Sequence, residues 1–170
     1  MQFGCGGLKN KDMKIFKFTK KDIKNVVKIA SQSFFSLKEK NKARKWIQCN
    51  FRAYPRLQYF VAKINNKVVG YILWLEKGGF RNESVWELEQ IAVDENYRGQ
   101  GIGAELINKS LEEIKKYLKK RKSTIKLIEI TTGTENKAQK LYEKTLGAQI
   151  ECIVKNFFRG DEVIMIVRYK

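Results

Sequence analysis

The residues best suited to binding chemistry form one glycine-rich stretch in the middle of the chain. Arg98-Gly99-Gln100-Gly101-Ile102-Gly103 follows an apolar, strand-like segment and precedes a helix-like one. Three glycines let the backbone curl tightly, and the curl presents N–H groups at the positive end of a helix. This arrangement suits a pyrophosphate, to which Arg98 can add two hydrogen bonds. A turn needed only for tight packing would also explain the glycines.

The spacing of these glycines excludes two other kinds of phosphate-binding loop. A P-loop needs Gly-Lys followed by Ser or Thr, and the sequence contains no such run. A dinucleotide fingerprint has the spacing Gly-x-Gly-x-x-Gly and follows the first strand of a βαβ unit. Here the glycines fall at 99, 101 and 103, after the fourth predicted strand.

Proton transfer in this chain must use groups other than histidine, because the sequence contains none. A His-ligated metal, a Ser-His pair and a His base are therefore excluded, and we expect no metal. Glu87 and Glu89 lie two residues apart on one face of a predicted strand, and Glu129 lies on the next strand. Each is a candidate base, although exposed carboxylates on a sheet face would look the same.

The cysteines favour a structural interpretation. Cys49 and Cys152 have no neighbour that would lower the thiol pKa. We therefore expect both to be buried structural residues rather than acyl-carrying nucleophiles.

Hydrophobic periodicity predicts a mixed α/β domain that must position these groups. Strands are expected at 13–18, 58–64, 68–75, 84–93, 125–131, 148–154 and 161–168, and helices at 23–34, 38–50, 101–120 and 135–146. Thr19 and Asp22 resemble a capping box before the first helix. Asn65-Asn66 forms a two-residue turn that tolerates positive φ.

The fourth predicted strand changes phase along its length. Trp86 and Leu88 are apolar at even positions, whereas Ile91 and Val93 are apolar at odd positions. One extra residue produces this slip, so the pattern indicates a β-bulge near residues 89–90. A strand end buried on both faces is the alternative, because Ala92 is also apolar.

Composition limits the class of protein. The chain has 170 residues, 43% of them hydrophobic, which suits one domain. We expect residues 1–12 to be a disordered extension and 13–170 to form the domain. No apolar run reaches the ~20 residues of a membrane span, and no signal peptide is visible. Cysteines without a pairing pattern fit a reducing cytosol, so we expect a cytoplasmic protein.

The net charge of +17 has two interpretations. It would attract an anionic partner such as nucleic acid. A generally lysine-rich composition, with solvated helix faces such as 115–122, also explains it and is the favoured interpretation for most of the charge.

At residues 98–103 the sequence closely resembles the GNAT family, the Gcn5-related N-acetyltransferases. Their cofactor motif is Arg or Gln, two residues, Gly, one residue, then Gly or Ala, and Arg98, Gly101 and Gly103 fill it. Residues 141–144 before Leu146-Gly147-Ala148 resemble the second motif of the family. The element order from 13 to 169 also agrees. The resemblance implies an α/β single-domain GNAT-type fold, with a mixed, mostly antiparallel sheet of about seven strands flanked by helices.

The resemblance also implies acetyl-CoA as co-substrate. Amides of residues 98–103 would bind its pyrophosphate, the main chain of Ile91 and Val93 would pair with the pantetheine arm, and a bulge N–H would polarise the acetyl carbonyl. Members usually place a CoA-binding Asn seven residues before a conserved Tyr, where this chain has Glu135. Either the last long helix starts one residue later and Asn136 serves, or that contact is lost. The implied cofactor-binding set is Ile91, Ala92, Val93, Arg98, Gly99, Gln100, Gly101, Ile102, Gly103, Ala104 and Asn136.

The implied reaction is direct attack by an amine on the thioester, through a tetrahedral intermediate. Glu87 lies where histone-acetylating members carry their base, and Glu129 lies where members acting on ribosomal protein N-termini carry theirs. Tyr142 resembles the general acid that protonates the leaving thiolate. Without the resemblance, Tyr142 reads as a core tyrosine.

The amine acceptor stays open between a small amine, a peptide N-terminus and a lysine. We expect it to bind near 31–56 and the loops at 76–83 and 155–160, where basic residues would repel a bare polyamine. The alternative function is a nucleic-acid-binding or ribosome-associated module with little catalysis, supported by the basic, aromatic segment 44–56. A homodimer is one option for the oligomeric state.

Overall fold

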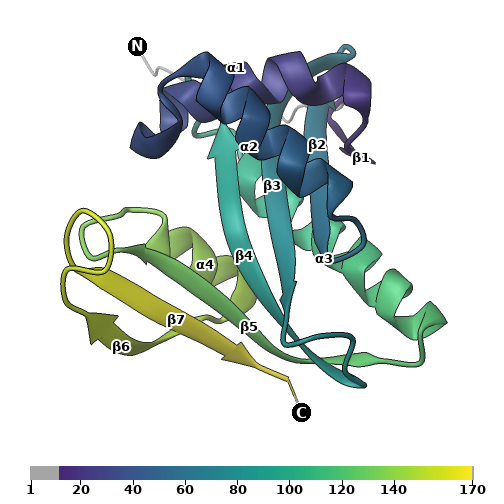
Figure 1. Ribbon diagram of the computed structural model, residues 1–170, viewed down its shortest axis with the longest axis vertical. Helices are drawn as coiled ribbons and strands as arrows, with labels where there is room; N and C mark the ends of the chain where they lie inside the picture. The colour runs from purple at the N-terminus through teal and green to yellow at the C-terminus, as the bar shows by residue number, and fades with distance from the viewer. Residues whose placement is uncertain (1–11, 170) are drawn as a thin grey trace, which may run out of the picture.

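Seven strands join in one mixed sheet across the described part of the chain, residues 12–169 of a computed structural model (Figure 1). The strand order is β1-β2-β3-β4-β5-β7-β6, and neighbours are antiparallel except β4 and β5, which are parallel. This topology confirms the predicted fold class. The strands are β1 (Lys14–Lys17), β2 (Leu57–Ile64), β3 (Lys67–Lys77), β4 (Glu83–Val93), β5 (Thr124–Gly133), β6 (Gln149–Val154) and β7 (Glu162–Arg168).

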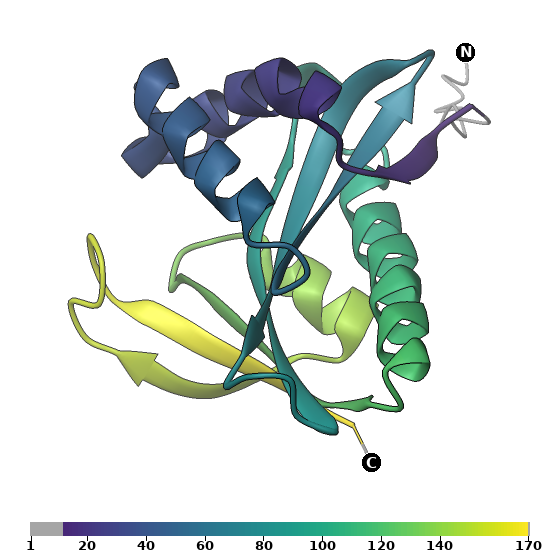
Figure 2. The same ribbon diagram turned by 45° about the vertical axis from the view of Figure 1, so that its right-hand side comes forward.

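Helices cover both faces of the sheet (Figures 1 and 2). The helices α1 (Ile23–Ser33) and α2 (Lys40–Arg52) lie over one face, and α3 (Ile102–Lys120) and α4 (Gln139–Leu146) lie over the other. Short 3-10 turns precede α1, α2 and α3 at η1 (Lys20–Asp22), η2 (Phe35–Leu37) and η3 (Glu95–Tyr97). The predicted helices are present, although α2 lies two residues later than expected.

Capping interactions explain where these elements begin. The predicted capping box is confirmed, because the Thr19 amide donates to Asp22 Oδ2 at 2.9 Å. It opens η1, which leads directly into α1. The predicted turn is also confirmed, with φ of 47° at Asn65 and 61° at Asn66.

The helix expected from residue 135 was predicted too early, since α4 begins at Gln139. Asn136 Nδ2 donates to Thr132 Oγ1 at 2.7 Å, and Asn136 Oδ1 accepts from the Ala138 amide at 3.0 Å. Local side-chain bonds of this kind compete with helical ones and hold the segment as a turn. Gly147, at φ 68°, ends α4 as expected.

Two hydrophobic clusters lie on opposite faces of the sheet. One packs against α3, where Ile107, Leu111, Ile114 and Leu118 are all buried, as their spacing predicted. The other lies beneath α1 and α2, and its sheet side includes Tyr59, Tyr71 and Ala92.

The change of phase in β4 is a β-bulge. Leu73 on β3 lies opposite Gln90, and Trp74 lies opposite Leu88, so Glu89 is the extra residue. Trp86 and Leu88 belong to the cluster under α3, and Ile91 and Val93 pack against the same cluster. The bulge prediction is therefore confirmed. The alternative also holds in part, because Ala92 is buried on the opposite face.

Beyond the bulge, β4 and β5 separate. They pair only from Glu83 to Glu87 on β4, after which β5 continues alongside β7 as far as Gly133. Figure 1 shows the two strands diverging. The edge of β4 from residue 88 to 93 is therefore left without a strand partner on the β5 side.

The expectation of buried cysteines was wrong, because Cys49 and Cys152 are both exposed. Cys49 lies on the outer side of α2, whose inner side carries the buried Ala43 and Ile47. Cys152 lies on β6, an edge strand whose residues are exposed except for the half-buried Val154. The predicted extension at 1–12 lies outside the described residues except for Asp12. Within residues 12–169 no helix is long and apolar enough to cross a membrane.

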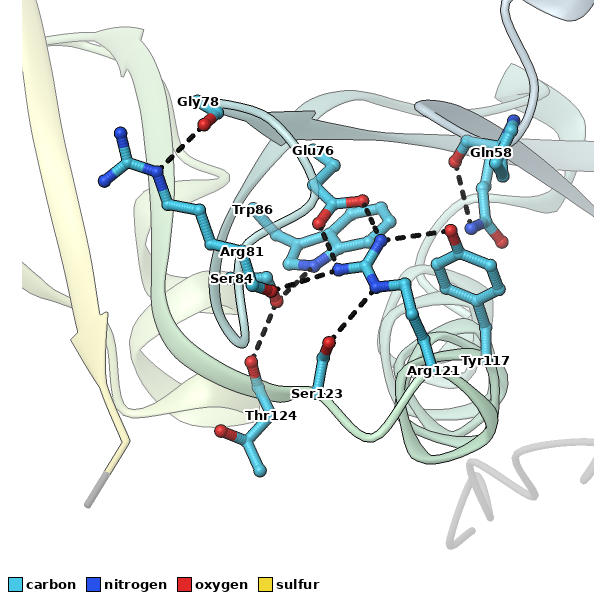
Figure 3. Close-up of polar contacts among 11 residues, drawn as sticks. Gln58, Glu76, Gly78, Arg81, Ser84, Trp86, Tyr117, Arg121, Ser123 and Thr124 are labelled. Carbon is cyan, nitrogen blue, oxygen red and sulfur yellow. Dashed lines mark hydrogen bonds and ion pairs between the residues drawn. The ribbon is translucent and has the colours of Figure 1, made fainter.

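A buried ion pair fixes the C-terminal end of α3 to the β3–β4 hairpin (Figure 3). Glu76, 2% exposed, accepts two hydrogen bonds from the Arg121 guanidinium. Arg121 also donates to Tyr117 Oη at 3.1 Å and to Ser123 Oγ at 3.2 Å. Its guanidinium further stacks 5.0 Å from the Phe80 ring centroid.

We expect Arg121→Ala to lower the free energy of unfolding by about 3 kcal/mol, because it leaves the Glu76 carboxylate buried without a partner. Urea unfolding at neutral pH measures the change. Arg168→Ala is the control, because Arg168 and Glu151 form an exposed pair with side chains 60% and 47% exposed. That control should change stability far less, because solvent screens an exposed pair. Equal effects of the two variants would contradict the role assigned to the buried pair.

Candidate active site

The loop before α3 uses its glycines in two different ways. Gly99 and Gly101 adopt φ of +75° and +79°, and a Cβ at either would meet no atom within 4 Å. Both are glycine because of backbone conformation, so tight packing does not explain them. At Gly103, by contrast, a Cβ would lie 3.1 Å from Leu141 Cδ2. Gly103 thus allows α3 and α4 to approach closely.

The bend leaves backbone donors at the start of α3. Gly101 is the N-cap, so the amides of residues 102–104 have no acceptor within the helix and lie at its positive end. The Ile102 side chain is buried, so a ligand can reach only its main chain. Arg98 is exposed, and its Nε donates to the Val93 carbonyl at 3.1 Å, which holds the guanidinium beside the end of β4.

A cavity of about 530 Å³ occupies the gap between β4 and β5. Its walls come from the bulged half of β4, the end of β5, the segment leading into α4, and the C-terminal end of α1. The structure therefore gathers residues that are far apart in the sequence. The predicted site residues among its lining are Glu89, Ile91, Ala92, Val93, Arg98, Asn136 and Tyr142.

Tyr142 belongs both to the core and to the cavity. It is 5% exposed and packs in the cluster under α3, yet it also lines the cavity. Burial raises the pKa of Tyr142 to about 12. The hydroxyl is therefore protonated at neutral pH, as a proton donor must be.

The three candidate carboxylates are not equivalent. Lys77 Nζ lies 3.2 Å from Glu87 Oε2 and 2.9 Å from Glu129 Oε1, so one ammonium pairs with two of them. Glu89 alone of the three lines the cavity. Burial raises the pKa of Glu89, the charge of Glu87 raises it further, and Lys77 opposes both effects.

Sequence reasoning missed several residues at this site. Lys77 lies at the end of β3, and only the register of three strands brings it to Glu87 and Glu129. Ser33 and Phe34 reach the cavity wall from the end of α1. Among the described residues, Ser33 Oγ is a buried side-chain oxygen without a hydrogen-bond partner. All three lie in segments expected near the acceptor, but no local sequence signal gives any of them a role at the site.

The segments expected to surround the acceptor are brought together only in part. Arg159, in the β6–β7 connection, places its guanidinium 3.4 Å from the Phe35 ring centroid in η2. Phe157 and Phe158 beside it are exposed and lie in edge-to-face contact at 4.6 Å. The loop at 76–83 lies elsewhere, tied through Glu76 and Phe80 to Arg121 after the C-terminal end of α3.

Comparisons with known proteins agree with this geometry. The model of the acetyltransferase (GNAT) family matches residues 23–148. An uncharacterized N-acetyltransferase of Methanocaldococcus jannaschii is 34% identical over 125 residues, which is 69% of this chain and 52% of that protein. The chain therefore spans about half the length of the curated relative that it matches.

Solved structures share the fold across nearly the whole chain. Ard1 from Thermoplasma volcanium superposes with a TM-score of 0.73 at 22% identity, covering 94% of this chain and 99% of that one. A chain of the NatC complex bound to Gag peptide and CoA superposes with a TM-score of 0.74 at 14% identity, with coverage of 94% and 99%. The family match, together with the divided sheet and the glycine bend, shows that this chain belongs to the acetyltransferase (GNAT) family.

Proposed function

We propose that this protein is an N-acetyltransferase that moves an acetyl group from acetyl-CoA to a primary amine, with a peptide N-terminus as the favoured acceptor. The observation that carries the proposal is the single cavity that joins the bulged half of β4, Arg98, Asn136 and Tyr142. The Glu89 carboxylate, the Tyr142 phenol and the backbone of β4 thus line one cavity.

The residues present suit acetyl-CoA. The unpaired edge of β4 from 88 to 93 offers backbone hydrogen bonds to the amides of an extended pantetheine arm. The free amides of residues 102–104 and the Arg98 guanidinium suit its pyrophosphate. Ser33 Oγ, buried and without a partner, is available to a polar group of either substrate. When bound, acetyl-CoA supplies the activated acetyl carbonyl.

The chain supplies the proton transfers. A peptide α-amino group has an ordinary pKa of about 8, so at neutral pH it arrives mostly protonated. A base must therefore take up a proton, directly or through water. Glu89 is our choice, because it lines the cavity and its raised pKa makes it a better proton acceptor than an ordinary carboxylate. Tyr142 is our choice as the donor to the departing thiolate, and Asn136 lies on the same wall.

Several features support a peptide acceptor. The net charge of +17 disfavours a bare polyamine. The connections that carry Phe35, Phe157 and Phe158 present exposed aromatic surface suited to side chains that follow a terminal residue. A chain of the NatC complex, which was solved bound to Gag peptide and CoA, has a similar fold, and this likeness supports the proposal. We propose that the protein acts in the cytoplasm. A homodimer remains a prediction for its oligomeric state.

An acceptor panel tests the proposed function. We expect thiol release from acetyl-CoA with peptides that carry a free α-amino group, and much slower release with spermidine. The same peptides with an acetylated N-terminus and no lysine are the matched control and should give none. Absence of release with every peptide and amine, together with salt-sensitive RNA binding that needs no CoA, would favour the nucleic-acid-binding alternative.

Gly101→Glu should weaken binding of CoA at least tenfold, because it places a carboxylate where the pyrophosphate is expected. Isothermal titration calorimetry with CoA measures the affinity. Gly79→Glu is a matched control, since Gly79 has φ +87°, equally open surroundings and a place in the β3–β4 loop. It adds the same charge and similar backbone strain. Equal CoA affinity in both variants would refute the loop assignment.

Tyr142→Phe should lower kcat by about 100-fold, the lower part of the range for a general acid, and leave CoA affinity within about twofold. The ring stays in the core, so packing changes little. Steady-state kinetics with an active peptide, combined with CoA titration, separates the two effects. Full turnover in this variant would assign Tyr142 to packing alone.

A further inference from the structure

We propose that Lys77 is a positioning residue that pairs with Glu87 and Glu129 and thereby reserves Glu89 to accept the proton of the substrate amine. This inference rests on the proposed acetyl transfer and adds a division of labour among its carboxylates. It concerns how three acidic side chains and one ammonium share a small volume between β3, β4 and β5.

The register of the sheet places two carboxylates side by side, and Lys77 neutralises their repulsion. Glu87 on β4 and Glu129 on β5 are direct partners in the last described pair of the parallel ladder, just before the strands separate. Their side chains are only 15% and 22% exposed, so two neighbouring negative charges would repel strongly. Lys77 is the last residue of β3, and its ammonium lies within 3.2 Å of both carboxylates.

Glu89 stands apart because of the bulge. As the extra residue of β4 it has no partner on β3, and it lines the cavity that also contains Tyr142. Neither Glu87 nor Glu129 is part of the cavity lining. The Lys77 ammonium thus pairs with Glu87 and Glu129, which lie outside the cavity lining, while Glu89 inside the cavity forms no such pair with it.

The charged groups that act on Glu89 are Glu87 on its own strand and Lys77 on β3, and Lys77 in turn pairs with Glu129 on β5. Arg98 and Lys137 also line the cavity that contains Glu89. Tyr59 and Tyr71 also face it, but burial raises the pKa of each well above neutrality, so both are uncharged. Their hydroxyls are engaged with Asn50 of α2 and Gln90 of β4, at 3.3 and 3.1 Å.

This arrangement predicts that two substitutions shift the pKa of Glu89 in opposite directions. Lys77→Met removes the cation that opposes protonation of Glu89, so the pKa of Glu89 should rise by about one unit or more. Glu87→Gln removes the adjacent negative charge and frees Lys77, so that pKa should fall. Lys77→Arg keeps the cation and should leave the pKa of Glu89 within about half a unit of the unmodified protein.

Carboxyl ¹³C NMR titration of glutamate-labelled full-length protein measures these shifts, with the Glu89 signal assigned by its loss in Glu89→Gln. The kinetic counterpart is the acidic limb of kcat/KM for an α-amino peptide. Since Glu89 must be deprotonated to act, the limb should move to higher pH in Lys77→Met, to lower pH in Glu87→Gln, and return to its original place in Lys77→Arg.

An unmoved Glu89 titration in a folded Lys77→Met protein, with its thermal unfolding intact, would overturn the proposal. So would a shift in the same direction for Lys77→Met and Glu87→Gln. If Lys77→Met fails to fold, the pair of Glu87→Gln and Lys77→Arg still decides, because a Glu89 pKa that does not fall in the first variant refutes the coupling. The titration needs no turnover, so an unmodified protein inactive with every acceptor would instead refute the acetyl transfer.

Discussion

The arrangement of this molecule depends on one surplus residue in the middle of its sheet. Glu89 has no partner on β3, so every side chain of β4 beyond it changes face. The apolar residues on both sides of the bulge nevertheless reach the same core, because the sequence changes phase at the same point. β4 then separates from β5, which leaves backbone groups of β4 without a strand partner among the described residues. Such unpaired groups are costly unless water or a ligand supplies the missing hydrogen bonds.

The sequence predicted those features that local chemistry determines. The phase change from Trp86 and Leu88 to Ile91 and Val93 revealed the bulge, and glycine with positive φ marked the loop before α3. Errors arose where side chains compete with the main chain, as at Asn136, whose hydrogen bonds delay α4. The ammonium between Glu87 and Glu129 was beyond prediction, because it follows from the register of three strands and no local pattern encodes that register.

The positive charge of this protein lies at the surface, whereas the buried charged side chains of the described residues are acidic. Among the described residues the charged side chains that are buried are Asp22, Glu76 and Asp94. Each has a more exposed cation beside it, namely Lys63 at 2.6 Å, Arg121 and Lys28 at 4.0 Å. Long basic side chains can cover a buried acid while the rest of the side chain stays in water. A small part of the positive charge therefore has a structural role.

The close approach of Gly103 to Leu141 has a consequence for the acetyl donor of the proposed reaction. Leu141 directly precedes Tyr142, and a side chain at position 103 would crowd Leu141, so the first turn of α3 lies close against the helix that carries the phenol. Both helices pack on the same core, and dense interiors resist sliding. The span from the amides of residues 102–104 to the phenol is consequently constant, and under the proposed function it would set the length of the acetyl donor. Under that proposal, a thioester whose anionic group lies nearer to its sulfur, or one without such a group, would not reach both the amides and the phenol at once.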